Sequence, residues 1–239
     1  MNDSLALITG AAHRLGRIFA LTLAKHGHAI VMHYQHSAEE AASTAAEIRA
    51  LGVQVYPVEA DLTDAAQIQT IFSKIDSLHL PLKVVINSAA RMDHAHLRKI
   101  SVEDWDATFN LNLRAPFLVA QQAAERMAAG GLIVNVTDAG VGKIWTGFPA
   151  YITSKAGLEM LTRLQAKTYA PNVRVNAIAP GLVLPSSELS AEEWEKLIHR
   201  LPLKHSASVE EIAGALEFLL ANDSVTGQTI SVDGGYSLI

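Results

Sequence analysis

Two side chains that could work as a proton donor and its activator, Tyr151 and Lys155, stand four residues apart. On a helix this spacing places both on one face, in neighbouring turns. A phenol has an ordinary pKa of about 10, and a nearby ammonium group stabilises the phenolate and lowers that pKa. The spacing therefore predicts Tyr151 as a general acid, with Lys155 lowering the pKa of its phenol.

A glycine-bearing turn near the start of the sequence has the residue types that a phosphate group needs. Residues 9–16 read Thr-Gly-Ala-Ala-His-Arg-Leu-Gly and stand between a short apolar run and an amphipathic segment. Gly10 allows a tight turn, the small Ala11 and Ala12 let backbone N–H groups approach a pyrophosphate, and the following helix offers unpaired donors. The turn predicts a dinucleotide site, and a simple strand-to-helix connection is the alternative interpretation.

The end of the second apolar run bears on which dinucleotide would bind. A site for NAD places a carboxylate about 20 residues past the turn, where it binds the ribose 2′-hydroxyl. Residues 33–37 read His-Tyr-Gln-His-Ser, and no acid follows before Glu39. Arg14 in the turn could reach a 2′-phosphate, which favours NADP(H); it could also be a solvated residue of the first helical turn. Asp61 could bind the adenine amino group or cap a helix, although Asp64 is the better cap.

Alternating elements must position these groups. Short apolar runs, typical of buried strands, alternate with longer amphipathic segments, which predicts βαβ units. We expect one α/β domain over residues 1–239, a Rossmann-type doubly wound parallel sheet of about seven strands with helices on both faces. Gly27 and Gly52 are each placed to end a helix before a strand. The expected strands are Leu5–Thr9, Ala29–His33, Val53–Val58, Val84–Asn87, Leu132–Val136, Arg174–Ala179 and Thr229–Val232.

The composition narrows the classes of function. A net charge of −5 without a block of like charges argues against a nucleic-acid partner. With no cysteine there is no disulfide framework, thiolate metal site or cysteine nucleophile. The histidines lack the partners of a zinc site, so we expect no metal. No apolar run is long enough to span a membrane, and we expect a cytoplasmic protein that acts on a small molecule.

Together these motifs resemble the short-chain dehydrogenase/reductase family over the whole chain. Asn87 begins an Asn-Ser-Ala-Ala segment similar to the family's Asn-Asn-Ala-Gly, Asn112 matches the active-site asparagine, and Pro180-Gly181 matches the turn below nicotinamide. The resemblance implies that Tyr151 donates the proton, Lys155 also holds the ribose, and Asn112 anchors a water relay. It also implies a homo-oligomer, commonly a tetramer.

Within that family the chain is most similar to pteridine reductases. The phosphate turn, the segment at 33–37 and the C-terminal segment at 232–238 carry this similarity. It implies that His36 and Ser37 join Arg14 around the 2′-phosphate. The cofactor-binding residues that follow from the turn and from the resemblance are Gly10, Arg14, Leu15, Tyr34, His36, Ser37, Asp61, Leu62, Asn87, Ser88, Ala89, Tyr151, Lys155, Pro180 and Gly181.

Asp138 is the main departure from the general family. Most members have a serine at this position, thirteen residues before the tyrosine, whereas pteridine reductases have an aspartate. A carboxylate only accepts hydrogen bonds and repels a developing alkoxide, which disfavours simple carbonyl reduction. Reduction of a cyclic C=N bond instead needs a proton on nitrogen, and Asp138 could orient such a heterocycle or relay the proton through Tyr151. A turn or helix cap is the plain structural alternative.

The substrate side of the site is less regular. Residues 182–203, including a helix-like piece at Glu188–Arg200, are expected to form a loop over the crevice. The phenylalanine that stacks on the pterin in trypanosomatid pteridine reductases is replaced here, and Met92 could cover a flat ring instead. We assign Met92, Trp145, Phe148 and Leu182 to the substrate pocket, while Trp194 on the helix-like piece should turn inward; the aromatic residues could equally serve packing alone.

Three functions remain open at this point. The first is an NADPH-dependent reductase of a pterin-like or related C=N heterocycle, with Tyr151 as proton donor and Asp138 as orienting or relay group. The second is a carbonyl or 3-oxoacyl reductase of the same family. The third is a nucleotide-binding protein without turnover, against which the intact Tyr151, Lys155 and Asn112 argue.

Overall fold

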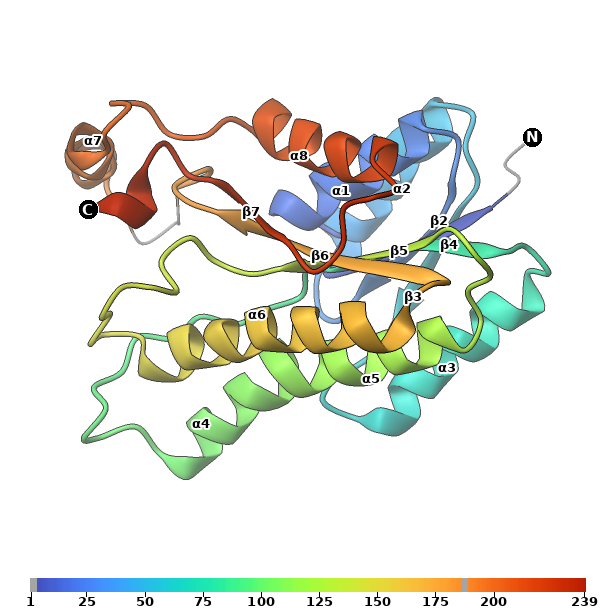
Figure 1. The fold of residues 1–239 in the computed structure, drawn as a ribbon, viewed down its shortest axis with the longest axis horizontal. Helices are drawn as coiled ribbons and strands as arrows, with labels where there is room; N and C mark the ends of the chain where they lie inside the picture. The colour runs from blue at the N-terminus through green and yellow to red at the C-terminus, as the bar shows by residue number, and fades with distance from the viewer. Residues whose placement is uncertain (1–3, 186–188) are drawn as a thin grey trace.

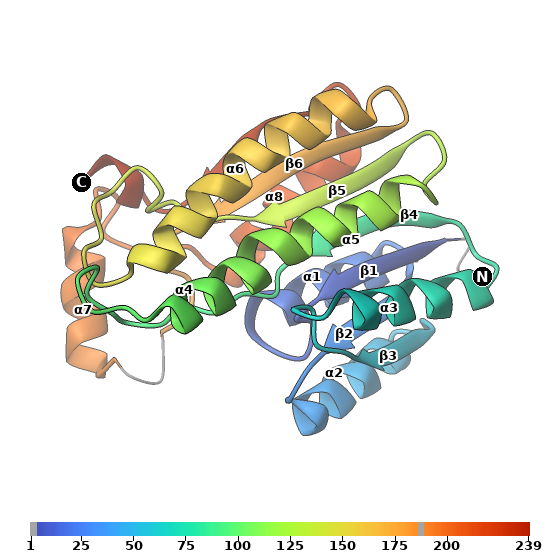
Figure 2. The ribbon, with the colours of Figure 1, turned by 90° about the horizontal axis from the view of Figure 1, so that it is seen from below.

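The structure, a computed structural model, describes residues 4–185 and 189–239. Seven strands form one sheet in the order β3-β2-β1-β4-β5-β6-β7, and every neighbouring pair is parallel. Figures 1 and 2 show helices on both faces of this sheet. The strands are β1 Leu5–Thr9, β2 Ala29–Tyr34, β3 Val55–Glu59, β4 Leu82–Asn87, β5 Gly131–Val136, β6 Val173–Pro180 and β7 Thr229–Val232.

The helices fall into two layers, with α1, α2 and α8 on one face and α3 to α6 on the other (Figure 1). A π-helical turn, η1, joins α4 to α5, and a short 3-10 turn, η2, lies near the C-terminus. The helical segments are α1 Arg14–Lys25, α2 Ala38–Ala50, α3 Ala65–Ser77, α4 Val102–Phe109, η1 Asn110–Arg114, α5 Ala115–Ala124, α6 Pro149–Tyr169, α7 Ala191–Arg200, α8 Val209–Ala221 and η2 Tyr236–Leu238.

Alternate strand residues build two hydrophobic cores. Ala6 and Ile8 of β1 face the layer that contains α1, while Leu5 and Leu7 face the layer that contains α3 and α5. All four side chains are fully buried. A parallel strand covered on both faces has no solvent side, which explains why these strands read as continuous apolar runs. The doubly wound parallel fold predicted from the sequence is thus confirmed.

Several element boundaries differ from the sequence-based expectations. The third strand begins at Val55 instead of at residue 53, after Gly52 closes α2 at a φ of +77°. The helix expected at 188–200 begins only at Ala191, because the Ser190 side chain and Glu193 form a reciprocal capping box. Residue 188 lies outside the described residues. As expected, Asp64 caps α3 by accepting a hydrogen bond from the Ala66 N–H at 2.8 Å.

No helix in the described ranges is both long and apolar enough to cross a membrane.

Candidate functional site

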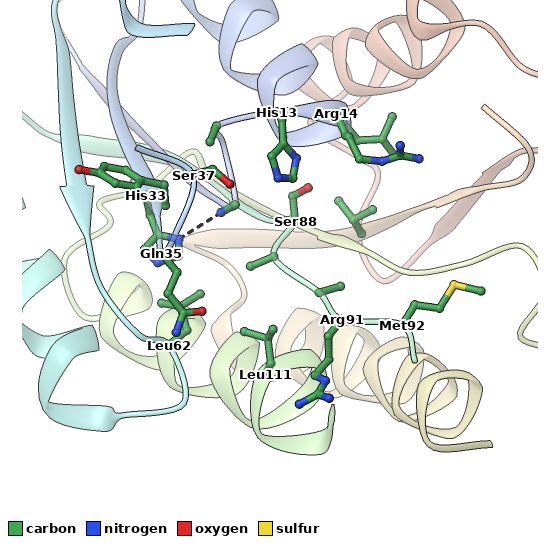
Figure 3. Close-up of a pocket in the computed structure, with 18 of the residues that line it drawn as sticks. His13, Arg14, His33, Gln35, Ser37, Leu62, Ser88, Arg91, Met92 and Leu111 are labelled. Carbon is green, nitrogen blue, oxygen red and sulfur yellow. Dashed lines mark hydrogen bonds between the residues drawn. The ribbon is translucent and has the colours of Figure 1, made fainter. Parts of the chain in front are cut away.

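A cavity of about 600 Å³ opens at the carboxyl ends of the parallel strands. It runs from the turn after β1, past the end of β2, to the start of α6. In Figure 3, Gln35 and Ser37 lie toward one side of this cavity and Met92 lies toward the other. The lining residues are Gly10, Ala12, His13, Arg14, Leu15, Gly16, His33, Tyr34, Gln35, His36, Ser37, Leu62, Ser88, Ala89, Ala90, Arg91, Met92, Leu111, Val136, Thr137, Asp138, Tyr151, Lys155, Pro180 and Gly181.

The turn after β1 leaves the amino end of α1 open to the cavity. Gly10 adopts a φ of +64°, and a Cβ atom added there would lie 2.9 Å from the Ala89 Cα. A Cβ on Gly16 would lie 2.0 Å from the Gly10 carbonyl oxygen. No side chain caps the amino end of α1, and its first turn contains no acid. The free N–H groups and the helix dipole therefore favour a bound anion.

Two buried polar side chains hold this turn in place, and the sequence analysis assigned a role to neither. The Gly10 N–H donates to Nδ1 of His33 at 3.1 Å, so Nε2 carries the ring proton and donates to the Ala60 carbonyl at 2.9 Å. Burial lowers the pKa of His33, which keeps its ring neutral. Thr9 Oγ1 accepts the N–H groups of Ser88 and Ala89 at 3.0 and 3.1 Å. Polar residues at the ends of buried strands were the only sequence signal for these contacts.

The end of β2 presents Gln35, His36 and Ser37 to the cavity without a carboxylate. Arg14, which has a φ of +50°, donates hydrogen bonds to the carbonyl oxygens of Leu184 and Pro185 at 3.0 and 3.1 Å. In Figure 3 its guanidinium points away from Ser37. The role of Arg14 beside a 2′-phosphate therefore stays a prediction, while its observed partners lie in the segment that follows β6.

At the opposite end of the cavity, Tyr151 and Asp138 form a direct pair. The Tyr151 hydroxyl donates to Asp138 Oδ2 at 2.7 Å, and the Gly140 N–H donates to the other carboxylate oxygen, also at 2.7 Å. One turn further along α6, the ammonium group of Lys155 donates to the Val136 carbonyl at 2.7 Å. Asp138 thus closes a turn through one carboxylate oxygen and contacts the Tyr151 hydroxyl through the other.

The electrostatics of this pair correct one expectation. Burial raises the pKa of Tyr151 well above its usual value, and the carboxylate of Asp138 raises it further. Burial lowers the pKa of Lys155 to about 8, with Asp138 acting in the opposite direction, and burial raises the pKa of Asp138 itself. The net shift of the phenol pKa is therefore upward, because burial and an adjacent anion favour the neutral phenol, and the lowering by Lys155 stays a prediction.

Three of the predicted catalytic and cofactor-binding residues lie outside the cavity lining. Asn112 is fully buried and bonds both backbone groups of Arg91 at 2.9 Å, as well as Ser154 Oγ at 3.1 Å. It therefore fixes the segment after β4. Asn87 bonds the side chain of Asn135 at 2.8 Å. Asp61 accepts the N–H and the hydroxyl of a neighbouring threonine, both at 2.8 Å, so it closes a turn.

The predicted substrate-pocket residues also divide into one that lines the cavity and others that lie outside its lining. Met92 lines the cavity, and 47 % of its surface is exposed. Trp145 and Phe148 pack against each other with ring centroids 5.9 Å apart, outside the lining, and the carbonyl of Leu182 accepts the Ala207 N–H. Trp194 is only half-buried on α7, which contains no buried residue. Lining residues that are absent from the predicted site include His13, His33, Gln35, Arg91, Leu111 and Thr137.

Comparisons with known proteins match nearly the whole chain. A family model described as Enoyl-(Acyl carrier protein) reductase matches residues 10–237. The 3-oxoacyl-[acyl-carrier-protein] reductase FabG of Staphylococcus aureus is 32 % identical over 238 residues, which cover 96 % of each protein.

Two solved structures superpose closely on this fold. FolM Alternative dihydrofolate reductase 1 from Brucella suis, in complex with NADP, has a TM-score of 0.93 and 30 % identity, covering 100 % of this chain and 96 % of that one. A short chain dehydrogenase from Burkholderia cenocepacia in complex with NADP has a TM-score of 0.91 and 26 % identity, covering 98 % of both chains. The chain belongs to the short-chain dehydrogenase/reductase family.

Proposed function

We propose that this protein is an NADPH-dependent reductase of a pterin-like or related C=N heterocycle. The observation that carries the proposal is the 2.7 Å hydrogen bond between the Tyr151 hydroxyl and the Asp138 carboxylate. A similar fold belongs to a structure named as an alternative dihydrofolate reductase, which supports the same substrate class.

The lining of the cavity fits NADP(H). Asp138 is the only carboxylate among the described lining residues, and it stands at the end away from β2. The end of the cavity beside the turn after β1 instead offers the free N–H groups of α1 and the side chains of His13, Arg14 and His36. These hydrogen-bond donors suit phosphate groups. Both solved structures compared above hold NADP. When bound, the cofactor supplies the hydride.

The chain's own residues then handle the proton. The raised pKa keeps the Tyr151 phenol protonated at neutral pH, so the proton is available to a substrate. Proton transfer to a ketone oxygen would place a phenolate directly against Asp138, and two adjacent anions repel. A basic ring nitrogen can take up the Tyr151 proton before the hydride arrives, which gives a cationic C=N bond that the phenolate and the Asp138 carboxylate both attract. Hydride transfer to the carbon then leaves a neutral amine, and the phenolate regains its proton from water. The pair therefore suits C=N reduction better than alkoxide formation.

A 3-oxoacyl reductase is the second candidate, favoured by the identity to FabG. The two candidates are separated by following NADPH oxidation with dihydrobiopterin, dihydrofolate, a small ketone and a 3-oxoacyl thioester. We expect turnover of the dihydropterins alone. Fast turnover confined to the carbonyl substrates would establish the second candidate, and NADPH binding without any turnover would establish a binding protein.

Two variants test the pair itself. Tyr151→Phe should lower kcat/KM by at least about 100-fold, because it removes the general acid, whereas Tyr56→Phe, which removes a phenol at the edge of the sheet, should not change it. Asp138→Ser should abolish dihydropterin turnover and raise ketone turnover. Unchanged rates for Tyr151→Phe with every active substrate would refute the assignment.

We further propose that the protein forms a homo-oligomer through α5 and α6. Phe117, Met160 and Leu164 expose 41, 54 and 57 % of their surfaces there, around an apolar hollow of about 490 Å³. A contiguous exposed apolar patch of this kind favours association, and a second copy of the chain is the partner that we expect. Phe117→Arg should shift the mass measured by light scattering to the monomer; an unchanged mass would contradict this interface.

A further inference from the structure

His33 is a buried titratable side chain that the proposed proton chemistry does not use. It lies on β2 and lines the cavity, although only 3 % of its surface is exposed. Its Nδ1 accepts the Gly10 N–H at 3.1 Å, a bond drawn as a dashed line in Figure 3, and its Nε2 donates to the Ala60 carbonyl at 2.9 Å. The ring therefore joins the turn after β1 to the residue that follows β3.

The backbone of His33 adds another contact to the same turn. The Ala11 N–H donates to the His33 carbonyl at 2.9 Å. Two consecutive N–H groups of the turn, those of Gly10 and Ala11, are therefore bound by His33. The N–H groups left for a phosphate belong to the first turn of α1, which no side chain caps. These donors follow the turn directly, so their position depends on how His33 holds it.

The contact with Gly10 requires one charge state of the ring. Only a neutral imidazole with its proton on Nε2 can accept at Nδ1 and donate at Nε2. Burial lowers the pKa of His33, while the Ala60 carbonyl and the charge of Asp61 act in the opposite direction. A second proton would turn Nδ1 into a donor that faces the Gly10 N–H, which is also a donor. The contact is therefore sensitive to acid.

The turn has little room to move away from a charged ring. The sheet order places β1 between β2 and β4. On the β4 side, a Cβ atom added to Gly10 would lie 2.9 Å from the Ala89 Cα. The Thr44 hydroxyl of α2 also donates to the Ala12 carbonyl at 2.8 Å. Protonation of His33 must therefore displace the ring or change the shape of the turn.

Other ionisable groups stand on the elements around His33. The charge of Asp61 reaches the ring, and Arg114 of η1 donates to the carbonyl of the nearby Thr63 at 3.1 Å. The remaining ionisable residues are Glu59 on β3, Asp64 before α3, and His13, Arg14 and His36 along the cavity. A substitution of His33 keeps all of these groups, so their own titration largely cancels when that variant and the wild type are compared at one pH.

We propose that His33 is a positioning residue for the dinucleotide, and that a proton on its Nδ1 releases the phosphate turn and weakens cofactor binding in acid. This inference rests on the dinucleotide site of the proposed function and is independent of which substrate is reduced. With a neutral ring, the turn stays on β2 and the amino end of α1 is in place for the phosphates. With a charged ring, the Gly10 N–H loses its acceptor and the donors of α1 shift.

Two variants separate the contacts of the two ring nitrogens. In His33→Asn, the side-chain oxygen can take the place of Nδ1 and accept the Gly10 N–H without titrating. In His33→Gln, the longer side chain reaches the place of Nε2 and leaves the Gly10 N–H without an acceptor. At about pH 7.5, calorimetric titration with NADP+ should give His33→Asn a Kd within about threefold of the wild type and His33→Gln a Kd about tenfold higher. An unchanged Kd for His33→Gln would overturn the proposal.

The pH profile of binding is the measurement that a merely structural role would not move. The Kd of the wild type, divided by that of His33→Asn, should rise at least about threefold between about pH 7.5 and about pH 5. The rise should begin below 6.5, the ordinary pKa of histidine, because burial lowers the pKa of His33. His28→Asn is the matched control, since His28 precedes β2, bonds the Ser4 hydroxyl at 2.9 Å and also has a pKa lowered by burial. It should follow the wild-type profile.

The same titrations separate failure of this role from failure of the cofactor site. NADP+ is used because it survives acid and needs no turnover, and circular dichroism at each pH confirms that the proteins compared are folded. A wild type that binds NADP+ with the same pH profile as His33→Asn would overturn the role of His33 alone. A wild type that binds no NADP+ at any pH would overturn the dinucleotide site itself.

Discussion

Gly10 should tolerate no side chain, and the structure allows the cost to be divided into two parts. Its φ of +64° lies in the left-handed region, which costs a residue with a Cβ atom about 1–2 kcal/mol. The added Cβ would also lie 2.9 Å from the Ala89 Cα, a backbone atom that cannot swing aside. Overpacking of this kind costs about 1–3 kcal/mol. We therefore expect Gly10→Ala to lower the free energy of unfolding by about 2–5 kcal/mol.

Two other glycines serve as controls for the separate parts. Gly27 has a φ of +85° with no atom within 4 Å of its added Cβ, so Gly27→Ala should cost only the conformational part, about 1–2 kcal/mol. Gly142 has neither a positive φ nor a close neighbour. Gly142→Ala should leave the stability unchanged or raise it by up to about 1 kcal/mol, through the smaller entropy of the unfolded chain.

Urea unfolding followed by tryptophan fluorescence measures the three stabilities, at one protein concentration because association would shift the transition. Titration with NADPH, followed by its fluorescence, measures the effect on the site. NADPH affinity should fall in Gly10→Ala and stay unchanged in Gly27→Ala and Gly142→Ala. The reasoning is refuted if Gly10→Ala costs no more than Gly27→Ala and binds NADPH as the wild type does.

Three further predictions concern cofactor binding and the loop contacts. His36→Asp places a carboxylate at the end of β2, so it should raise the Kd for NADPH by at least about tenfold and lower that for NADH; parallel changes for both nucleotides would contradict the 2′-phosphate assignment. The pKa of Lys155 is about 8, so its positive charge is lost as the pH rises through that value and NADPH binding should weaken there. Asp138→Asn should move that midpoint to lower pH, because the carboxylate raises the pKa of Lys155; an unchanged or higher midpoint would argue against this coupling. Thr9→Val removes an oxygen that accepts two backbone N–H groups, so it should lower the free energy of unfolding in urea by about 2 kcal/mol. Thr168→Val, at an exposed position, should lower it little. Equal losses for the two variants would disprove the role of Thr9.

Local sequence patterns were enough to define the scaffold. The runs at Leu5–Thr9 and Thr229–Val232 coincide with strands β1 and β7. In β1 the continuous apolar run reports burial on both faces of the sheet. Gly27 and Gly52 adopt positive φ at helix ends, as their positions indicated. The Tyr151 and Lys155 spacing also placed both residues on α6, because helical spacing depends only on neighbours along the chain.

Local sequence patterns do not predict contacts between segments that are distant along the chain. Asn112 was expected beside the cavity and instead fixes the backbone of Arg91, since the direction of a side chain depends on how its helix packs.

What the sequence by itself determined was the parallel α/β scaffold, the phosphate turn and the residues that could do chemistry. Only the tertiary structure decided the charge state of the reacting pair, because a pKa depends on burial and on neighbours in space. It raised the pKa of Tyr151 by burying the phenol against Asp138, where the spacing to Lys155 had predicted a lower value. It also placed the Lys143 ammonium group over the Tyr236 ring, since packing and not sequence distance sets which side chains meet.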